Sequence, residues 1–326
     1  MENRKIKWGI VGLGNIAQQF ANELMLTNTA EICAVASRSL SKAQEFANQF
    51  QCPNAYGSYD EIFLDPNVEI LYIATPHDSH AELSIKAMQN GKNVLCEKPL
   101  ALHYTDVEQM ITTAKKHNVF FMEAFWTRFN PSVREALEHV QNGKIGAIQY
   151  INADFAIKFE NPDNTRMTDI KLGGGALMDI GVYPLFLAYL FLGKPKEIIA
   201  KSNFYATGAD TQTSVILHYD NAQAVLHSSF LYTSNMDATI CGSKGRIVLQ
   251  PSPLWFMTES YSLIQGEDKT LFEKPTLGKG YTYEIMECCD CLLNNKKESE
   301  LWSHQNSLDL ASIIEAIKNQ IGLIYL

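Results

Sequence analysis

Short apolar runs alternate with amphipathic stretches through the first 122 residues. The runs are typical of buried strands, and the stretches are typical of helices that cover a sheet. This alternation predicts a doubly wound parallel sheet. Strands are expected at residues 5–11, 31–36, 68–74, 93–96 and 119–122, and helices at residues 16–24, 42–50, 81–90 and 105–117. Ser58 with Glu61 and Thr105 with Glu108 have the spacing of capping boxes.

The pattern changes after residue 122, where longer segments alternate apolar and polar residues. They predict strands at residues 147–157, 213–219, 222–231, 238–241 and 246–249, and helices are expected at residues 131–142, 176–184, 281–294 and 303–318. Asp220-Asn221 and residues 242–245 suit hairpin turns, so the sheet should be antiparallel with one open face. That face would cover either a dimer partner or a substrate cleft. We expect two domains, 1–122 and 123–326, and leave open whether the C-terminal helix packs back on the first.

A glycine-rich loop joins the first predicted strand to the first predicted helix. Gly12, Gly14 and Ala17 match the pattern G-x-G-x-x-A, with Asn15 and Ile16 between them. The first glycine allows the tight turn, the second lets the backbone approach a pyrophosphate, and the alanine permits close packing of helix and strand. The helix N-terminus then offers free N–H groups to phosphate. The loop predicts a dinucleotide site in a Rossmann fold.

The end of the second predicted strand indicates which dinucleotide binds. Sites that prefer NAD usually have Asp or Glu there, to bind the adenosine ribose hydroxyls. Here the residues are Ser37 and Arg38. A hydroxyl and a guanidinium suit a ribose 2′-phosphate, which a carboxylate would repel. We therefore expect NADP rather than NAD.

Two further loops follow predicted strands and should share the carboxyl edge of the sheet, where open α/β sheets bind ligands. The first contains the candidate cofactor contacts Thr75, Pro76, His77 and His80, and capping of the next helix is the alternative for the two histidines. The second is Glu97-Lys98-Pro99, in which proline ends the strand. Lys98 can donate and accept a proton if burial or a neighbouring cation lowers its pKa.

The second half contains one unusual helix. Residues 173–175 are three glycines, and they precede Asp179 and Tyr183, which are four apart and share a helix face. Pro184 should kink this helix about one turn upstream. Glycines weaken a helix and permit close approach. An acid and a phenol beside them indicate a functional site, and a capped amphipathic helix is the alternative.

Composition narrows the class of protein. The 326 residues carry a formal net charge of −9, which argues against a general nucleic-acid binder. No apolar run reaches membrane-spanning length, and no secretory segment follows the N-terminus, so we expect a cytoplasmic protein with no membrane partner. The seven cysteines fit reduced thiols. Cys288 and Cys291 share a helix face but have no second Cys/His pair, so no metal is expected.

The motifs at residues 12–17, 37–38, 97–99, 126–131 and 173–184 together resemble the Gfo/Idh/MocA oxidoreductase family, over nearly the whole chain. Within it, the chain is most similar to the branch of dimeric dihydrodiol dehydrogenases and NADP-dependent D-xylose dehydrogenases. The resemblance implies a Rossmann domain followed by an α/β domain with an open, mostly antiparallel sheet. It also implies hydride transfer between a nicotinamide and a secondary alcohol or carbonyl of a sugar or cyclic diol. We expect a homodimer formed through the C-terminal sheet.

The resemblance also implies residue roles. Lys98 would be the catalytic or proton-relay residue, Glu97 would lie near the nicotinamide ribose, and Asp179 corresponds to the family's acidic residue. Many members have histidine at the position of Tyr183, whereas this branch has tyrosine as its general acid/base. A phenol needs a neighbouring cation to work at neutral pH. The sequence leaves open whether Lys98 or Tyr183 moves the proton.

Three aromatic or basic residues complete the prediction. Trp126 and Phe155 are candidates for an apolar wall against a sugar or cyclic diol, and Arg128 is a candidate cofactor contact. Because these segments supply few cations, we expect a neutral, ring-shaped substrate rather than a sugar phosphate. Two rival hypotheses are a non-catalytic, dinucleotide-binding regulatory relative and an oxidoreductase that never releases its NADP.

Overall fold

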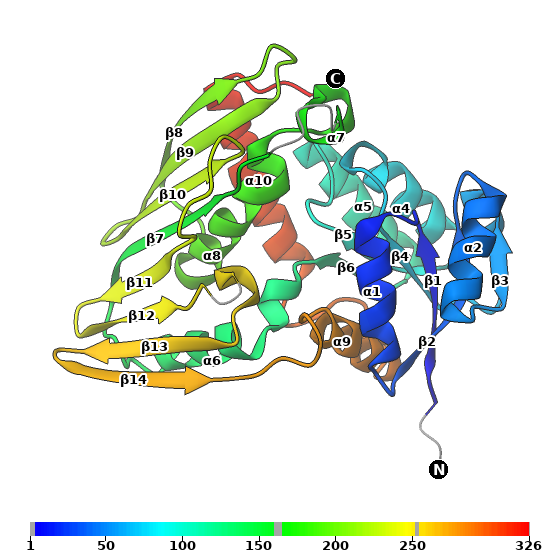
Figure 1. Ribbon diagram of the computed structural model, residues 1–326, viewed down its shortest axis with the longest axis horizontal. Helices are drawn as coiled ribbons and strands as arrows, with labels where there is room; N and C mark the ends of the chain where they lie inside the picture. Colours follow the sequence, from blue (N-terminus) through cyan, green and yellow to red (C-terminus); the bar gives the residue numbers. More distant parts are fainter. Residues whose placement is uncertain (1–3, 160–164, 252–253, 326) are drawn as a thin grey trace. The chain divides into compact units, whose positions relative to one another are not determined.

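The computed structural model describes residues 4–159, 165–251 and 254–325. The chain forms two compact units, each built around one sheet (Figure 1). The first contains Met1–Phe129 and Leu277–Leu308, and the second contains Asn130–Thr276 and Asp309–Leu326. The expected domain division after residue 122 stays a prediction, but residues 277–308 return to the first unit.

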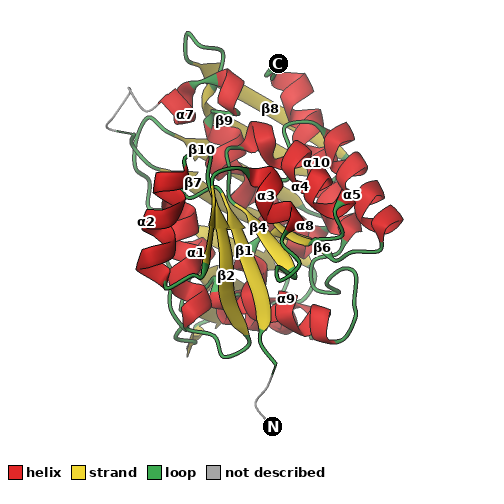
Figure 2. Ribbon diagram, turned by 90° about the vertical axis from the view of Figure 1, so that its right-hand side faces the viewer, coloured by secondary structure: helices red, strands yellow, loops and turns green. Residues whose placement is uncertain are grey.

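The first unit contains a six-stranded, fully parallel sheet of order β3-β2-β1-β4-β5-β6. Its strands are β1 (Ile6–Val11), β2 (Ala30–Ala36), β3 (Asn54–Tyr56), β4 (Ile70–Ile73), β5 (Asn93–Glu97) and β6 (Phe121–Ala124). Its helices are α1 (Asn15–Met25), α2 (Leu40–Phe50), α3 (Tyr59–Leu64), α4 (His80–Gln89), α5 (Tyr104–His117), α9 (Thr282–Leu293) and the start of α10 (His304–Ile321). Helices α3, α4 and α5 lie together (Figure 2). The predicted doubly wound sheet is confirmed.

The sheet order explains where a ligand would bind. The chain runs outward from β1 to β3 and then crosses to β4 on the other side of β1. This reversal makes the carboxyl end of β1 a topological switch point, where doubly wound folds bind ligands. Three of the loops predicted to carry function follow β1, β4 and β5, which are adjacent in the sheet, and Ser37–Arg38 follows β2 on the other side of β1.

Helix starts were predicted with mixed success. The Ser58–Glu61 capping box is present at α3, with both reciprocal hydrogen bonds. The Thr105–Glu108 box is wrong, because α5 begins at Tyr104 and its N-cap is His103. Thr105 therefore lies inside the first turn, where its hydroxyl is not at the capping position.

The second unit contains an eight-stranded mixed sheet of order β14-β13-β12-β11-β7-β10-β9-β8, in which only the β7–β10 pair is parallel. Its strands are β7 (Ile148–Ala156), β8 (Glu197–Phe204), β9 (Asp210–His218), β10 (Gln223–Ser229), β11 (Ala238–Gly242), β12 (Gly245–Leu249), β13 (Ser260–Gln265) and β14 (Asp268–Glu273). Its helices are α6 (Pro131–Gln141), α7 (Thr165–Thr168), α8 (Val182–Leu192) and the rest of α10. The predicted open, mostly antiparallel sheet is confirmed.

The sequence analysis missed β3, β8, β13 and β14, and two of these strands, β8 and β14, have weak burial patterns. Strand β14 has no buried residue and β8 has only Ala200 buried, so neither shows a clear apolar period. Both lie at edges of the sheet, where backbone pairing with one neighbour holds them.

The glycine-led helix departs from regular α-helix, as Pro184 predicted. A π-helical turn at Leu177–Gly181 runs directly into α8. Proline removes the hydrogen bond to residue 180 and its ring crowds that carbonyl, and a π-turn relieves both. Contrary to the expectation from sequence, the stretch Ile170–Leu192 is long and apolar enough to span a membrane, but 78% of its apolar window is buried inside the protein, as in a core helix.

Candidate functional site

The loop after β1 fits the pyrophosphate of a dinucleotide. Gly12 has φ +86°, and a Cβ there would lie 2.7 Å from the Thr75 side chain and 2.9 Å from the Ala74 carbonyl oxygen. Gly14 is the N-cap of α1, and nothing lies within 4 Å of the position its Cβ would take. The first turn of α1 has no acidic side chain, so its N–H groups remain favourable to an anion. Ala17 is fully buried, as close helix packing requires. Asn15 is exposed and Ile16 partly exposed, at the start of the helix.

The end of β2 presents two hydroxyls and one guanidinium. Ser37 is buried, and its hydroxyl accepts the Ser39 N–H at 3.3 Å. Arg38 is exposed, and its charge acts on Tyr59 at the start of α3. Burial raises the pKa of Tyr59, and the Arg38 charge opposes that rise. Ser39 caps α2, which has no acid in its first turn. The site is therefore cationic and rich in hydrogen-bond donors.

The loop after β4 contains a buried histidine that contacts the next loop of the sheet edge. His80 is fully buried, and its ring nitrogens lie 2.9 Å from the Pro99 carbonyl oxygen and 2.8 Å from that of Thr75. These contacts join the β4 loop to the β5 loop, and the expected cofactor contact of His80 stays a prediction. The His77 ring packs edge-on to it, 5.6 Å between centroids. Pro76 is partly exposed at the head of this turn.

The turn after β5 is built on a buried carboxylate. Glu97 is buried, and it accepts hydrogen bonds from the Tyr72 hydroxyl and, at 3.2 Å, from the Lys98 N–H. Lys98 itself is partly exposed, and the Lys98–Pro99 peptide is cis. A second carboxyl, Glu284 on α9, is fully buried, with neither oxygen hydrogen-bonded. Burial and the Glu97 charge raise the pKa of Glu284 well above its usual range, which favours its neutral form.

The segment after β6 is held by its own unit. Trp126 is 4% exposed and stacks on Tyr281, with ring centroids 4.5 Å apart. Arg128 donates from Nε to the Leu301 carbonyl at 2.8 Å and is partly exposed. Both side chains are thus fixed by residues that follow Thr276, a connection that the sequence did not predict.

In the second unit, the predicted acid and phenol lie in different surroundings. Asp179 is partly exposed and forms an ion pair with Arg166 at 3.2 Å. Tyr183 is 6% exposed and packs against Phe256 and Phe155, at centroid distances of 4.5 and 5.7 Å. Phe155 and Phe256 stack at 4.6 Å. The second unit thus brings Phe155 to Tyr183, as an aromatic wall requires, and adds Phe256 and Arg166.

The glycines before this helix make room for Asp210, a buried acid on β9. Gly175 has φ +129°, and a Cβ there would lie 2.3 Å from Asp210 Oδ1. The other carboxylate oxygen accepts the Leu177 N–H at 2.9 Å and the Thr213 hydroxyl at 2.7 Å. At the opposite end of the chain, Tyr325 donates to the Gly174 carbonyl at 3.0 Å. The glycines are thus explained by close packing around the start of the helix.

Cysteines and metal ligands offer no further centre within the described residues. No group of three or more His, Cys, Asp or Glu side chains there could hold a metal ion. Six of the seven cysteines are buried and Cys241 is partly exposed. Burial raises the pKa of the thiols, for example to about 12 at Cys33 and at Cys291, which keeps them protonated.

Comparison with known proteins is consistent with this architecture. Residues 6–125 match the family model described as "Oxidoreductase family, NAD-binding Rossmann fold", and residues 133–248 match the GFO/IDH/MocA C-terminal domain. The chain is 38% identical to a trans-1,2-dihydrobenzene-1,2-diol dehydrogenase of Xenopus tropicalis, over 98% of this chain and 99% of the relative. It is 37% identical to the mouse (Mus musculus) enzyme of that name, over 98% of each chain.

Two solved structures share the fold. A 3-ketoreductase from Actinomadura kijaniata, in complex with NADP and TDP-benzene, is 24% identical, with a TM-score of 0.87 over 98% of each chain. An aldose-aldose oxidoreductase from Caulobacter crescentus, complexed with glycerol, is 24% identical, with a TM-score of 0.88 over 97% of each chain. With the matches to both family models and to full-length relatives, they lead to one conclusion: the chain belongs to the Gfo/Idh/MocA family of oxidoreductases and has its NAD(P)-binding Rossmann fold.

Proposed function

We propose that this protein is an NADP-dependent dehydrogenase that acts on a secondary alcohol, or the matching carbonyl, of a neutral sugar or cyclic diol. The observation that carries the proposal is the position of Lys98, at the end of β5, on the same edge of the parallel sheet as the Gly12–Ala17 loop. The name of the relatives makes trans-1,2-dihydrobenzene-1,2-diol the first substrate to test.

The preference for NADP rests on the end of β2. Arg38 can pair with a phosphate through charge-assisted hydrogen bonds, and the Ser37 and Ser39 hydroxyls lie beside it in the chain. The N-terminus of α2 adds a positive dipole end. No carboxylate stands at the end of this strand to favour NAD. We further assign cofactor contacts to the Gly12–Ala17 loop, Thr75, Pro76, His77, Glu97 and Arg128.

The chain supplies the proton chemistry. When bound, the nicotinamide supplies the hydride acceptor in oxidation and the hydride donor in reduction. The hydroxyl proton passes to or from the chain, at Lys98 Nζ or at the Tyr183 phenolic oxygen. Such a general acid/base contributes about 10²–10⁴-fold to the rate. Asp179 is assigned to bind a substrate hydroxyl, and its ion pair with Arg166 fixes its orientation.

The aromatic cluster supports a ring-shaped, uncharged substrate. Phe155, Phe256 and Tyr183 offer apolar ring faces, which suit the C–H face of a sugar or a cyclic diol. The Arg166 charge is opposed by Asp179, so this cluster has little to attract a phosphate. Trp126 is also assigned as a substrate contact, because its aromatic ring suits the C–H face of a sugar or a cyclic diol.

A substrate panel tests the function. Purified protein would be mixed with NADP or NAD and with trans-1,2-dihydrobenzene-1,2-diol, D-xylose, D-glucose or their phosphates, and reduced cofactor would be followed by absorbance. We expect turnover with NADP on the neutral diol or a free sugar. Turnover confined to sugar phosphates would overturn the substrate class, and no turnover on any compound would overturn the function.

The rival hypotheses predict different results in the same assay. A regulatory relative would bind NADP and turn over none of the compounds, although it would have no need for Lys98, Asp179 and Tyr183 together. An oxidoreductase with retained cofactor would show nicotinamide absorbance as purified, and that absorbance would survive gel filtration. Free exchange of NADP favours the dehydrogenase.

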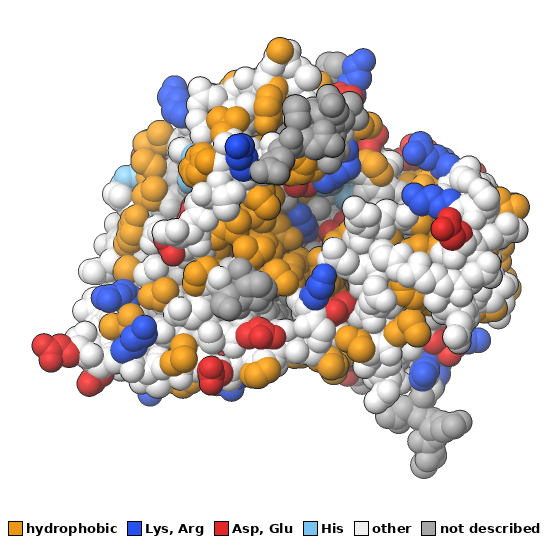
Figure 3. All heavy atoms as spheres, in the orientation of Figure 1, with side chains coloured by type: hydrophobic (Ala, Val, Ile, Leu, Met, Phe, Trp, Pro, Cys, Tyr) orange, Lys and Arg blue, Asp and Glu red, His pale blue; other side chains and the backbone are white. Residues whose placement is uncertain are grey.

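We also propose that a second copy covers the open face of the second sheet. Ile199, Ile216 and Val225 are paired across β8, β9 and β10, and they are 43%, 37% and 40% exposed. Figure 3 shows hydrophobic side chains gathered along the outer margin of β8 and β9. An apolar row of this kind is unusual on a face left open to water. Cytoplasmic location stays a prediction.

Sedimentation velocity tests the dimer. Ile216→Lys should convert a dimer to monomer, whereas Leu64→Lys should not, because Leu64 is an equally apolar, 71% exposed residue of the first unit. A monomeric wild type would end the proposal.

A further inference from the structure

Glu123 is a buried acid that no motif pointed to. It lies on β6, paired in register with Cys96 on β5, and it is 5% exposed. Its carboxylate accepts hydrogen bonds from the Leu100 N–H at 3.3 Å, the Trp302 indole N–H at 3.3 Å and the Ser307 hydroxyl at 2.6 Å. A buried carboxylate is costly unless it is paired, so a carboxylate kept here needs an explanation.

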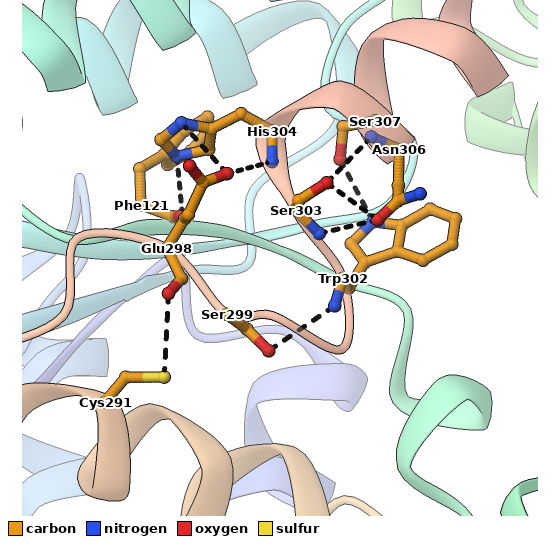
Figure 4. A network of polar contacts seen from close by, with 9 residues as sticks. All are labelled: Phe121, Cys291, Glu298, Ser299, Trp302, Ser303, His304, Asn306 and Ser307. Carbon is orange, nitrogen blue, oxygen red and sulfur yellow. Dashed lines mark hydrogen bonds and ion pairs between the residues drawn. The ribbon is translucent and has the colours of Figure 1, made fainter.

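Two of these donors come from a segment far along the chain. Figure 4 shows residues 298–307 as a polar network in which Trp302 and Ser307 lie together, with the indole N–H 3.0 Å from the Ser307 hydroxyl. His304 joins the same segment to β6, since its Nε2 lies 3.0 Å from the Phe121 carbonyl oxygen. The segment thus holds one side of the Glu123 carboxylate in a fixed place.

The third donor lies in the turn that carries Lys98. Leu100 follows the cis Lys98–Pro99 peptide, and its N–H points to the other oxygen of Glu123. Burial raises the pKa of Glu123 to about 7, and the Ser307, Trp302 and Leu100 hydrogen bonds and the Lys98 charge oppose that rise. The carboxylate and the Lys98 ammonium therefore interact electrostatically, so by reciprocity each favours the charged form of the other.

We propose that Glu123 is a positioning residue for Lys98, one that fixes the Lys98–Leu100 turn by hydrogen bond and holds the lysine in its ammonium form by charge. This role rests on the proposed function of Lys98. If Glu123 has this role, the proton affinity of Lys98 falls when Glu123 is neutralised. A merely structural Glu123 would fix the turn without affecting the lysine's protonation.

Other ionisable groups border this pair. On β5, Glu97 accepts the Lys98 N–H, and burial raises the pKa of the Cys96 thiol, with the Glu97 and Glu123 charges adding to that rise. On α10, His304 lies 3.6 Å from Glu298, and burial lowers its pKa. A test must therefore measure the protonation of Lys98 itself, because the pH dependence of activity could come from any of these groups.

Competitive acetylation reads that lysine directly. Trace labelling with acetic anhydride across pH, followed by mass spectrometry, gives the neutral fraction of Lys98, with the exposed Lys116 as an internal reference. In Glu123→Gln, Lys98 should be acetylated about tenfold faster than in wild type at about pH 8, the factor that corresponds to one pKa unit. Circular dichroism and NADP binding would check that the variant is folded. Unchanged Lys98 labelling in a folded variant overturns the proposal.

Ser307→Ala tests the same coupling if Glu123→Gln does not fold. Loss of this donor raises the pKa of Glu123 further, so Lys98 should be acetylated faster than in wild type near pH 7.5 and equally fast at about pH 9, where Glu123 is ionised in both. Ser303→Ala removes a hydroxyl of the same turn that bonds Asn306 instead, and should match wild type. Identical labelling in Ser307→Ala and Ser303→Ala at every pH overturns the proposal.

Labelling needs no turnover, so the two proposals can fail separately. Wild type that is inactive on the substrate panel, with Lys98 labelling that responds to Glu123→Gln, rejects the proposed function and retains the coupling. Active wild type with unresponsive labelling rejects the coupling alone. In active protein, Glu123→Gln should also lower kcat at least severalfold while the Kd for NADP stays unchanged, and an unchanged kcat counts against the role.

Discussion

The Asp210 carboxylate accepts the backbone N–H of Leu177 at 2.9 Å, at the start of the helical segment that carries Asp179 and Tyr183. Asp210→Ala should lower the free energy of unfolding by about 1–3 kcal/mol, because it leaves a buried donor without a partner. Urea denaturation measures this loss. Asp210→Asn is the matched control, since its amide oxygen can accept the same hydrogen bond. Equal losses in the two variants would show that the bond to Leu177 is not the source.

Arg38→Ala should weaken NADP binding by roughly 1.5–3 kcal/mol, the size of a charge-assisted contact, and leave NAD binding nearly unchanged. The reason is that only NADP has the 2′-phosphate that a guanidinium would bind. Titration of both cofactors into wild type and variant, followed by protein fluorescence, gives the two affinities. An NADP/NAD ratio that stays constant would reject the assignment.

Lys98→Met should leave the Kd for NADP largely intact and lower kcat by about 10²–10⁴-fold, as expected for loss of a general acid/base. Methionine keeps most of the apolar stem and removes the ammonium. Single-turnover kinetics would show whether the chemical step is affected. Near-normal turnover when chemistry limits the rate would exclude Lys98 from the mechanism.

Tyr183→Phe deletes one hydroxyl and keeps the ring that packs on Phe155 and Phe256. Turnover should fall far more than NADP affinity, since the aromatic cluster stays filled. Phe256→Leu, which alters the same cluster without touching the phenol, is the packing control. Full activity in Tyr183→Phe would leave Lys98 as the proton donor.

Stability should decline as pH rises through the weakly acidic range. Burial raises the pKa of Asp210 to about 6 and that of Glu123 to about 7, both above their usual values, so the folded state binds these protons more tightly than the unfolded state. The stability they contribute is complete at low pH and is lost as pH rises through the folded pKa, by about 3 kcal/mol each at most. Urea unfolding of wild type and Glu123→Gln at several pH values should show a shallower dependence in the variant. Parallel curves would contradict the Glu123 contribution.

Local motifs were predictable because a turn imposes its requirements on neighbouring residues. The glycines at 12 and 14, the pair Ser37–Arg38 and the proline after Lys98 each occupy a place that backbone geometry or charge restricts. The predicted parallel and antiparallel sheets followed from burial periods in the same way.

The features that could not be predicted depend on residues that come into contact only after folding. The Glu123 carboxylate accepts the Ser307 hydroxyl, and the Asp210 carboxylate accepts the Leu177 N–H. In each pair the two residues lie far apart along the chain. The spacing of residues within a short sequence motif cannot predict such pairs. The position of His80 at the sheet edge could be predicted, but not that its ring turns inward to two backbone carbonyls. Strand β14 lacks a buried face altogether.

The protected thiols have a practical consequence. Maleimides and iodoacetamide react with thiolates, and six of the seven cysteines are buried while the pKa of the partly exposed Cys241 is raised. The native cysteines should therefore react slowly with these reagents. A single cysteine introduced at the exposed position of Leu64 would carry a fluorophore or spin label with little competition, and no native thiol would first have to be removed.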